Sequence, residues 1–118
     1  MDKKSNPMSH KFGVAFKATA KLVHDIAKDK GWWDKPRADG EIIALIHAEL
    51  SEALEGLRAG NPKSEHIPKF SSLEEELADV VIRVMDMAEA RKCRLAEAII
   101  SKICFNVLRP KMHGGKKF

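Results

Sequence analysis

The sequence predicts an all-α protein, and three observations lead to that fold class. Apolar residues recur at steps of three and four along most of the chain, which is the period of an amphipathic helix. Few segments alternate apolar and polar residues with the β-branched enrichment of strands. Segments rich in glycine and proline divide the periodic stretches into helices joined by short loops, which favours antiparallel neighbours. We therefore expect a four-to-five-helix antiparallel bundle.

The first two helices are predicted over residues 9–30 and 41–59. Gly31 ends the first helix, and the glycines and proline of residues 31–40 indicate a loop. Asp39 is the expected N-cap of the second helix. The second helix is expected to bury one apolar stripe, made of Ile43, Ile46, Leu50, Leu54 and Leu57.

The third helix follows a polar loop over residues 60–69. Its start is marked by a capping box, formed either by Ser71 with Glu74 or by Ser72 with Glu75. Its expected core stripe is Leu73, Leu77, Val80, Val81 and Val84.

The last helix is predicted over residues 95–108, after a break near residues 92–94 that neither glycine nor proline marks. Pro110 stops it. One face of this helix carries polar donors at i, i+4 and i+7, namely Lys102, Asn106 and Arg109. Such donors suit an anionic chain of phosphate oxygens.

The whole chain, residues 1–118, suits one helical domain, with residues 1–8 flexible and residues 109–118 forming a basic tail. The tail is interpreted either as a frayed, solvated terminus or as a segment that closes over phosphate groups, with Lys116 and Lys117 adding positive charge. The net charge of +4 is mild, and we do not expect nucleic acid to be the partner.

Membrane insertion and secretion are not expected. The longest clearly apolar run, residues 42–46, is far too short to span a bilayer, and the first residues do not resemble a signal peptide. Cys93 and Cys104 have no ligand spacing and are interpreted as free thiols. We therefore expect a cytoplasmic protein.

Two short acidic pairs carry the functional signal. Glu49 and Glu52 are three residues apart in the second helix, and Glu76 and Asp79 are three apart in the third, so each pair shares a face. If the two helices are antiparallel, Glu52 and Asp79 lie at similar heights, about 10–12 Å from the turn, and the four acids face one another. Repulsion and desolvation make such a cluster unfavourable without a cation. Oxygen-only ligands suit Mg²⁺ or Mn²⁺ rather than zinc, so the sequence predicts a magnesium site.

Three further residues each have two interpretations. Asp86 is either an additional metal ligand or the intrahelical partner of Arg83. Trp32 and Trp33 either stack on a base or anchor their loop on the bundle.

The acidic spacing resembles a known family. Glu49-x-x-Glu52, 23 intervening residues and then Glu76-Leu77-Ala78-Asp79-Val80 look like the signature of the MazG-like, all-α nucleoside triphosphate pyrophosphohydrolases. The end of the chain is similar to the tail of small members of that family, through Lys102-Ile103-Cys104-Phe105-Asn106, Arg109-Pro110 and His113-Gly114-Gly115-Lys116-Lys117-Phe118. The match covers about residues 31–118. Phe105 departs from the pattern, because this position is often tyrosine in such tails and the chain has no tyrosine.

The resemblance implies a magnesium enzyme that splits a (deoxy)nucleoside triphosphate into the monophosphate and pyrophosphate. The four acids, Glu49, Glu52, Glu76 and Asp79, would ligate Mg²⁺, with Mn²⁺ as an alternative ion, and Glu49 or Glu52 would be the base. Trp33 is the preferred contact for the nucleotide base. A homodimer, or a dimer of dimers, follows from the resemblance and from the exposed apolar stripes expected on the first and last helices.

Two other functions stay open. One is a non-catalytic helical module that binds nucleic acid or protein through its basic ends. The other lies within the same fold and is an enzyme like phosphoribosyl-ATP pyrophosphohydrolase.

Overall fold

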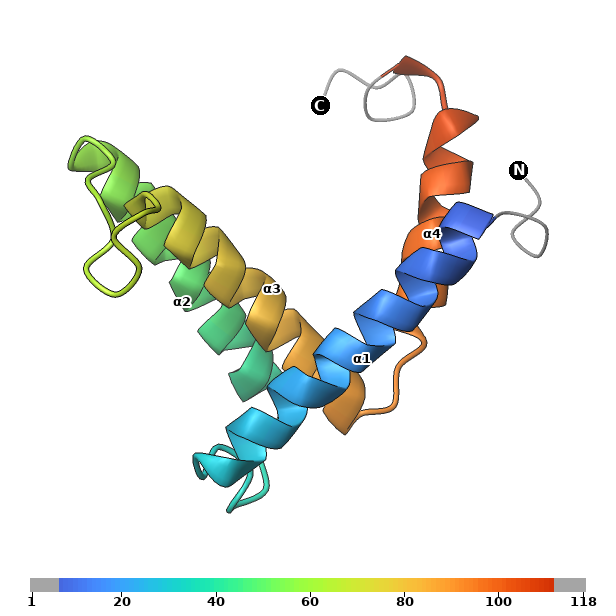
Figure 1. Ribbon diagram of the computed structural model, residues 1–118, viewed down its shortest axis with the longest axis horizontal. Helices are drawn as coiled ribbons and strands as arrows, with labels where there is room; N and C mark the ends of the chain where they lie inside the picture. The colour runs from blue at the N-terminus through green and yellow to red at the C-terminus, as the bar shows by residue number, and fades with distance from the viewer. Residues whose placement is uncertain (1–6, 112–118) are drawn as a thin grey trace.

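The structure, a computed structural model, describes residues 7–111 and contains four helices over that range (Figure 1). The helices are α1 (Pro7–Asp29), α2 (Asp39–Arg58), α3 (Ser72–Ala90) and α4 (Leu95–Val107). The all-α prediction is confirmed, and the predicted helix boundaries differ from these by at most two residues. No helix over the described range is long and apolar enough to cross a membrane.

The four helices pack as an open bundle with two arms (Figure 1). One arm is the antiparallel hairpin of α2 and α3, and the other is α1 with α4 packed along its N-terminal half. The arms meet where α1 crosses the C-terminal part of α3. The radius of gyration is 16.9 Å, compared with about 13–14 Å for a compact chain of this length, so the single chain leaves helix faces uncovered.

Local chemistry marks the start of α3 and the ends of α3 and α1. The capping box uses Ser71 and Glu74, because Ser71 Oγ accepts from the Glu74 amide at 3.1 Å and Glu74 Oε1 accepts from the Ser71 amide at 3.0 Å. The break after α3 is confirmed at Lys92, which adopts a left-handed backbone with φ of +53°. Gly31, with φ of +88°, follows the end of α1 as predicted.

The prediction that Asp39 caps α2 was wrong. The N-cap residue is Ala38, which has no side-chain hydrogen bond to the helix, and Asp39 is the first helical residue. The Asp39 carboxylate instead accepts from Arg91 Nε at 2.6 Å, in an ion pair that joins the start of α2 to the end of α3.

The hairpin is drawn together at its turn by a close approach of the two helices. Gly56 of α2 lies so near Ser72 that a Cβ atom at residue 56 would be 2.6 Å from the Ser72 hydroxyl. Asn61 Oδ1 accepts from the Leu73 amide at 2.9 Å. These contacts fix the register of α2 against α3, and hence the relative height of their acidic residues.

The predicted core stripes are largely exposed in the single chain, which corrects the sequence analysis. Four expected core residues of α2 are 44–49% exposed, namely Ile43, Leu50, Leu54 and Leu57. Two of α3 are 46–50% exposed, namely Leu77 and Val81. The buried apolar residues of the described range are mostly small: Ala20, Ile42, Ala53, Ala88 and Ala96. Helix α2 therefore packs on α3 through the face that carries Ile42 and Ala53, and no other element within residues 7–111 covers the larger stripe.

Candidate metal centre

Three of the four predicted acids converge in the α2–α3 hairpin. Glu49 of α2 and Glu76 and Asp79 of α3 each place one carboxylate oxygen within 4.8 Å of the others, and all three side chains are partly buried. We call these three residues the acidic cluster. Within the described range, Glu76 Oε2 is buried and has no hydrogen-bond partner. Glu52 is exposed and lies outside the acidic cluster.

The acidic cluster is electrostatically unfavourable without a counter-ion. Burial, a side-chain hydrogen bond with Glu49 and repulsion from Glu52 raise the pKa of Glu76 from 4.5 to about 7. Burial and repulsion from Glu49 also raise the pKa of Asp79. Both shifts mean that the fold disfavours the fully ionised cluster, and a bound divalent cation would reverse that preference.

A cavity of about 270 Å³ opens beside the acidic cluster, where α1 and the loop after it meet α2 and α3. Glu49 and Asp79 form part of its wall, together with Trp32 and two cationic side chains, Lys30 and Arg83. The apolar remainder of the wall comes largely from α1. The arrangement thus combines carboxylates, cations and an aromatic ring around one space large enough for part of a nucleotide.

Asp86 holds the loop after α1 and does not pair with Arg83, so that expectation was wrong. The Trp33 indole N–H donates to both Asp86 oxygens, at 3.0 and 3.1 Å, and His24 Nδ1 lies 2.7 Å from Asp86 Oδ1. Arg83 Nε instead donates to Glu49 Oε1 at 2.8 Å. Asp86 is also not one of the three grouped carboxylates.

The two tryptophans have different surroundings. Trp33 is half-buried, is bound to Asp86 and meets His24 edge-on with 5.5 Å between ring centres, which are the contacts of an anchor. Trp32 is 38% exposed and lines the cavity. The guanidinium carbons of Arg83 and Arg37 lie 4.6 and 5.0 Å from the centre of the Trp32 ring. That Trp33 stacks on a nucleotide base stays a prediction, and Trp32 is the tryptophan beside the acids.

The predicted phosphate contacts of α4 lie away from the acidic cluster within one chain. Lys102 and Asn106 are exposed on α4, which packs against α1, and Arg109 is exposed two residues beyond the end of that helix. None of the three lines the cavity. Lys102 Nζ and Arg109 Cζ lie 4.5 and 5.7 Å from the centre of the Phe105 ring. Lys116 and Lys117 fall outside the described residues.

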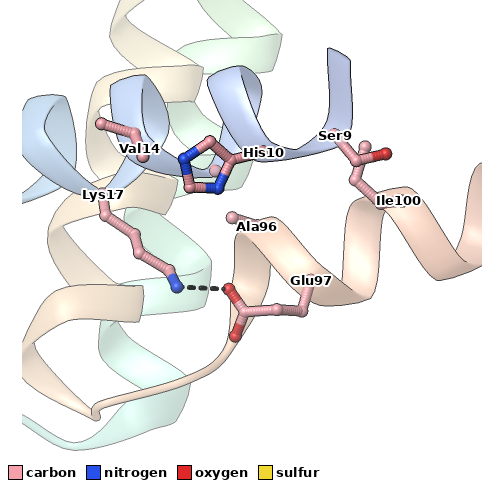
Figure 2. A pocket seen from close by; sticks show the side chains of 8 residues that line it. Ser9, His10, Val14, Lys17, Ala96, Glu97 and Ile100 are labelled. Carbon is pink, nitrogen blue, oxygen red and sulfur yellow. Dashed lines mark ion pairs between the residues drawn. The ribbon is translucent and has the colours of Figure 1, made fainter. Parts of the chain in front are cut away.

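A second hollow, of about 320 Å³, lies between the N-terminal half of α1 and the start of α4 (Figure 2). Lys17 and Glu97 form an ion pair at its edge, with 2.9 Å between Nζ and Oε1 (Figure 2). Ser9 is buried there, whereas His10 is exposed. None of the predicted site residues lines this hollow, so it adds nothing to the metal centre.

Sequence reasoning missed the roles of Lys30 and Arg83. Arg83 is four residues after Asp79 on α3, so the sequence places the two residues on one face of that helix. The pairing of Arg83 with Glu49 depends instead on how α2 and α3 pack. Lys30 reaches the cavity through the course of the loop after α1, for which the sequence holds no signal.

Comparison with protein-family models, curated proteins and solved structures gives no match for this chain.

Proposed function

We propose that the chain is a Mg²⁺-dependent pyrophosphohydrolase of MazG-like type, which converts a (deoxy)nucleoside triphosphate to the monophosphate and pyrophosphate. The observation that carries this proposal is the convergence of Glu49, Glu76 and Asp79, with one buried Glu76 oxygen left without a partner. A buried carboxylate oxygen is costly unless it is paired or bound to a metal.

The donor set of the acidic cluster fits a hard cation. All of its ligand atoms are carboxylate oxygens, which are preferred by Mg²⁺ and Mn²⁺, and no His or Cys belongs to the group. The raised pKa values of Glu76 and Asp79 have the same physical origin as metal affinity, since both express the cost of crowding negative charge.

In the proposed hydrolysis, the acids and the tryptophans have separate roles. The site would supply, through a held Mg²⁺, positive charge that offsets the charge developing on the departing pyrophosphate. Glu49, Glu76 and Asp79 would hold the ion. Glu52, exposed but near enough for its charge to raise the pKa of Glu76, would accept a proton from the water that attacks phosphorus as the bond to pyrophosphate breaks. Trp32 or Trp33 would contact the base.

The chain is proposed to work as a homodimer or a dimer of dimers. Helix α2 exposes an apolar stripe made of Ile43, Leu50, Leu54 and Leu57, and α3 exposes Leu77 and Val81. A second hairpin would cover these apolar side chains. In such an assembly, the cationic side chains of α4 from one copy would reach the acidic cluster of a second copy and not the cluster of their own chain.

The test is pyrophosphate release from a panel of canonical and modified triphosphates with and without Mg²⁺. Replacing Glu49→Gln or Asp79→Asn should lower turnover by about 10³-fold or more and leave the helical circular dichroism unchanged. Glu55→Gln is the matched control, because Glu55 is an exposed acid of the same helix that pairs with Arg58. Undiminished turnover in both cluster variants would refute the ligand assignment. Release from phosphoribosyl-ATP alone would favour the other enzyme of this fold.

A further inference from the structure

Arg83 is a cation held in position at the edge of the acidic cluster. It lies one turn after Asp79 on α3, and its side chain is 26% exposed. Its Nε atom donates to Glu49 Oε1 at 2.8 Å, and its guanidinium carbon lies 4.6 Å from the centre of the Trp32 ring. A hydrogen bond and an aromatic contact therefore orient the guanidinium before any ligand arrives.

Most of the hydrogen-bonding capacity of Arg83 is unused. A guanidinium has five N–H donors, and the contact with Glu49 uses the one on Nε. Over the described range, Nη1 and Nη2 make no hydrogen bond, and Arg83 lines the cavity of about 270 Å³ together with Lys30 and Asp79.

Arg37 provides a comparison, because it meets the same Trp32 ring at 5.0 Å but has two of its nitrogens engaged within the chain. Its Nε donates to the Trp32 carbonyl at 2.7 Å and its Nη1 donates to Glu41 at 2.9 Å. Arg37 does not line the cavity. The two arginines thus share an aromatic contact, but only Arg83 lines the cavity and has both Nη1 and Nη2 without a hydrogen bond in the described range.

We infer that Arg83 binds the phosphate chain of the substrate, with Nε on Glu49 and with Nη1 and Nη2 donating to phosphate oxygens. The inference rests on the proposed function, since it names a residue of the cavity wall that would bind the substrate of that same site. The planar fork of a guanidinium matches pairs of phosphate oxygens, and fixing it in advance lowers the entropy lost on binding. Arg83 would thereby join Glu49, a proposed metal ligand, to the phosphate chain of the substrate.

Two binding measurements on the full chain separate this role from a purely structural one. The first titrates the protein with Mn²⁺ alone, followed by electron paramagnetic resonance. The second titrates it with inorganic tripolyphosphate by calorimetry, at a Mg²⁺ concentration that saturates each variant. The variants are Arg83→Met and Arg83→Lys, with Arg37→Met as the control that also removes a cation from the Trp32 ring.

Arg83→Met should weaken tripolyphosphate binding by about 10- to 100-fold, the range for losing charge-assisted hydrogen bonds, while Mn²⁺ affinity changes less than about threefold. Arg83→Lys keeps the charge without the fork and should fall between Arg83→Met and the wild type. Arg37→Met should match the wild type in both titrations.

The inference is wrong if Arg83→Met retains tripolyphosphate affinity, or if its loss is matched by an equal loss of Mn²⁺ affinity, because Arg83 would then only orient Glu49. If Arg83→Met does not fold, Arg83→Lys gives the same decision through its loss of tripolyphosphate affinity. A wild-type protein that binds no Mn²⁺ overturns the proposed function as well, whereas wild-type Mn²⁺ binding with unchanged variants overturns this inference alone.

Discussion

The two arms of the molecule carry opposite halves of the predicted site. The α2–α3 hairpin holds the partly buried Glu49, Glu76 and Asp79. The arm formed by α1 and α4 carries Lys102, exposed on α4, and Arg109, exposed just beyond the end of α4 (Figure 1). In a single chain, the cations beside the acids are instead Arg83 and Lys30. The packing of α4 on α1 thus separates the predicted phosphate contacts from the predicted metal ligands, although the sequence analysis expected both groups at one ligand.

Two acids of α3 show a second contrast. Asp79 and Asp86 are two turns apart, but Asp79 has a pKa raised by burial and repulsion, while Asp86 accepts from Trp33 and lies against His24. Asp79 is therefore a destabilising charge that a cation would relieve, and Asp86 is a stabilising one that holds a loop.

The largest expected effect concerns the uncovered face of the hairpin. Leu54→Glu places a charge on the exposed α2 stripe and should weaken self-association by about 100-fold or more, because an unpaired charge would have to be buried. Sedimentation velocity measures the dissociation constant. Ser51→Glu is the control, since Ser51 is exposed and outside the stripe. A wild-type chain that is monomeric at all concentrations would disprove the proposed assembly.

The next effect concerns the loop anchored by Asp86. Asp86→Ala should lower the free energy of unfolding by about 2–4 kcal/mol, because it leaves the Trp33 indole N–H and His24 without their partner in a site where Asp86 and His24 are only 17% and 15% exposed. Urea denaturation measures this change. Asp79→Asn should not destabilise the metal-free chain, and a loss of stability as large as that of Asp86→Ala would contradict the distinction between the two acids.

A smaller effect is expected from the pH dependence of stability without metal. Because the pKa of Glu76 rises from 4.5 to about 7 on folding, the folded chain binds more protons between those values. The stability that comes from this extra proton binding is fully present below about pH 4.5 and is lost as the pH rises through about 7. Glu76→Gln should flatten that decline and stabilise the chain at pH 8 by about 1 kcal/mol, after allowance for solvent screening.

Urea denaturation between pH 5 and 8 measures the decline, and added Mg²⁺ should oppose it in the wild type alone. The raised pKa of exposed His66, which lies 2.7 Å from Glu75, acts in the same direction, so the comparison must be between wild type and Glu76→Gln. Parallel pH profiles for the two proteins would show that Glu76 does not titrate as described.

The smallest effect is expected for α4 in the single chain. In the Leu54→Glu background, replacing Lys102 and Arg109 by methionine should change tripolyphosphate affinity by less than about twofold, because solvent-exposed charges on a separate arm are screened. A larger loss in the associated wild-type background would indicate that α4 serves a second copy. A large loss in the monomer would place α4 at its own acidic cluster and contradict the separation of the arms.

Helix positions could be predicted because their signals are local. Gly31 and the Ser71 capping box mark boundaries through chemistry that acts within a few residues, whereas no glycine or proline marks the break at Lys92. Burial could not be predicted in the same way. Periodicity identifies residues that share a face, but α2 has apolar residues on two faces, and only packing decides that Ile42 is buried and Leu50 is exposed.

The acidic cluster was predictable for a related reason. The i, i+3 spacing and the antiparallel turn predicted four facing acids, and the structure brings the carboxylate oxygens of Glu49, Glu76 and Asp79 within 4.8 Å of one another while leaving Glu52 outside. The partners of Arg83 and Asp86 were not predictable, since they depend on the course of the loop after α1 and on the angle at which α1 crosses α3.

The central claim is that the acidic cluster binds a divalent cation, and anomalous diffraction from crystals grown with Mn²⁺ tests it most directly. The account predicts a single anomalous peak between the carboxylates of Glu49, Glu76 and Asp79, absent in crystals of Asp79→Asn. No peak at that place under saturating Mn²⁺, or one that persists unchanged in the variant, would contradict it.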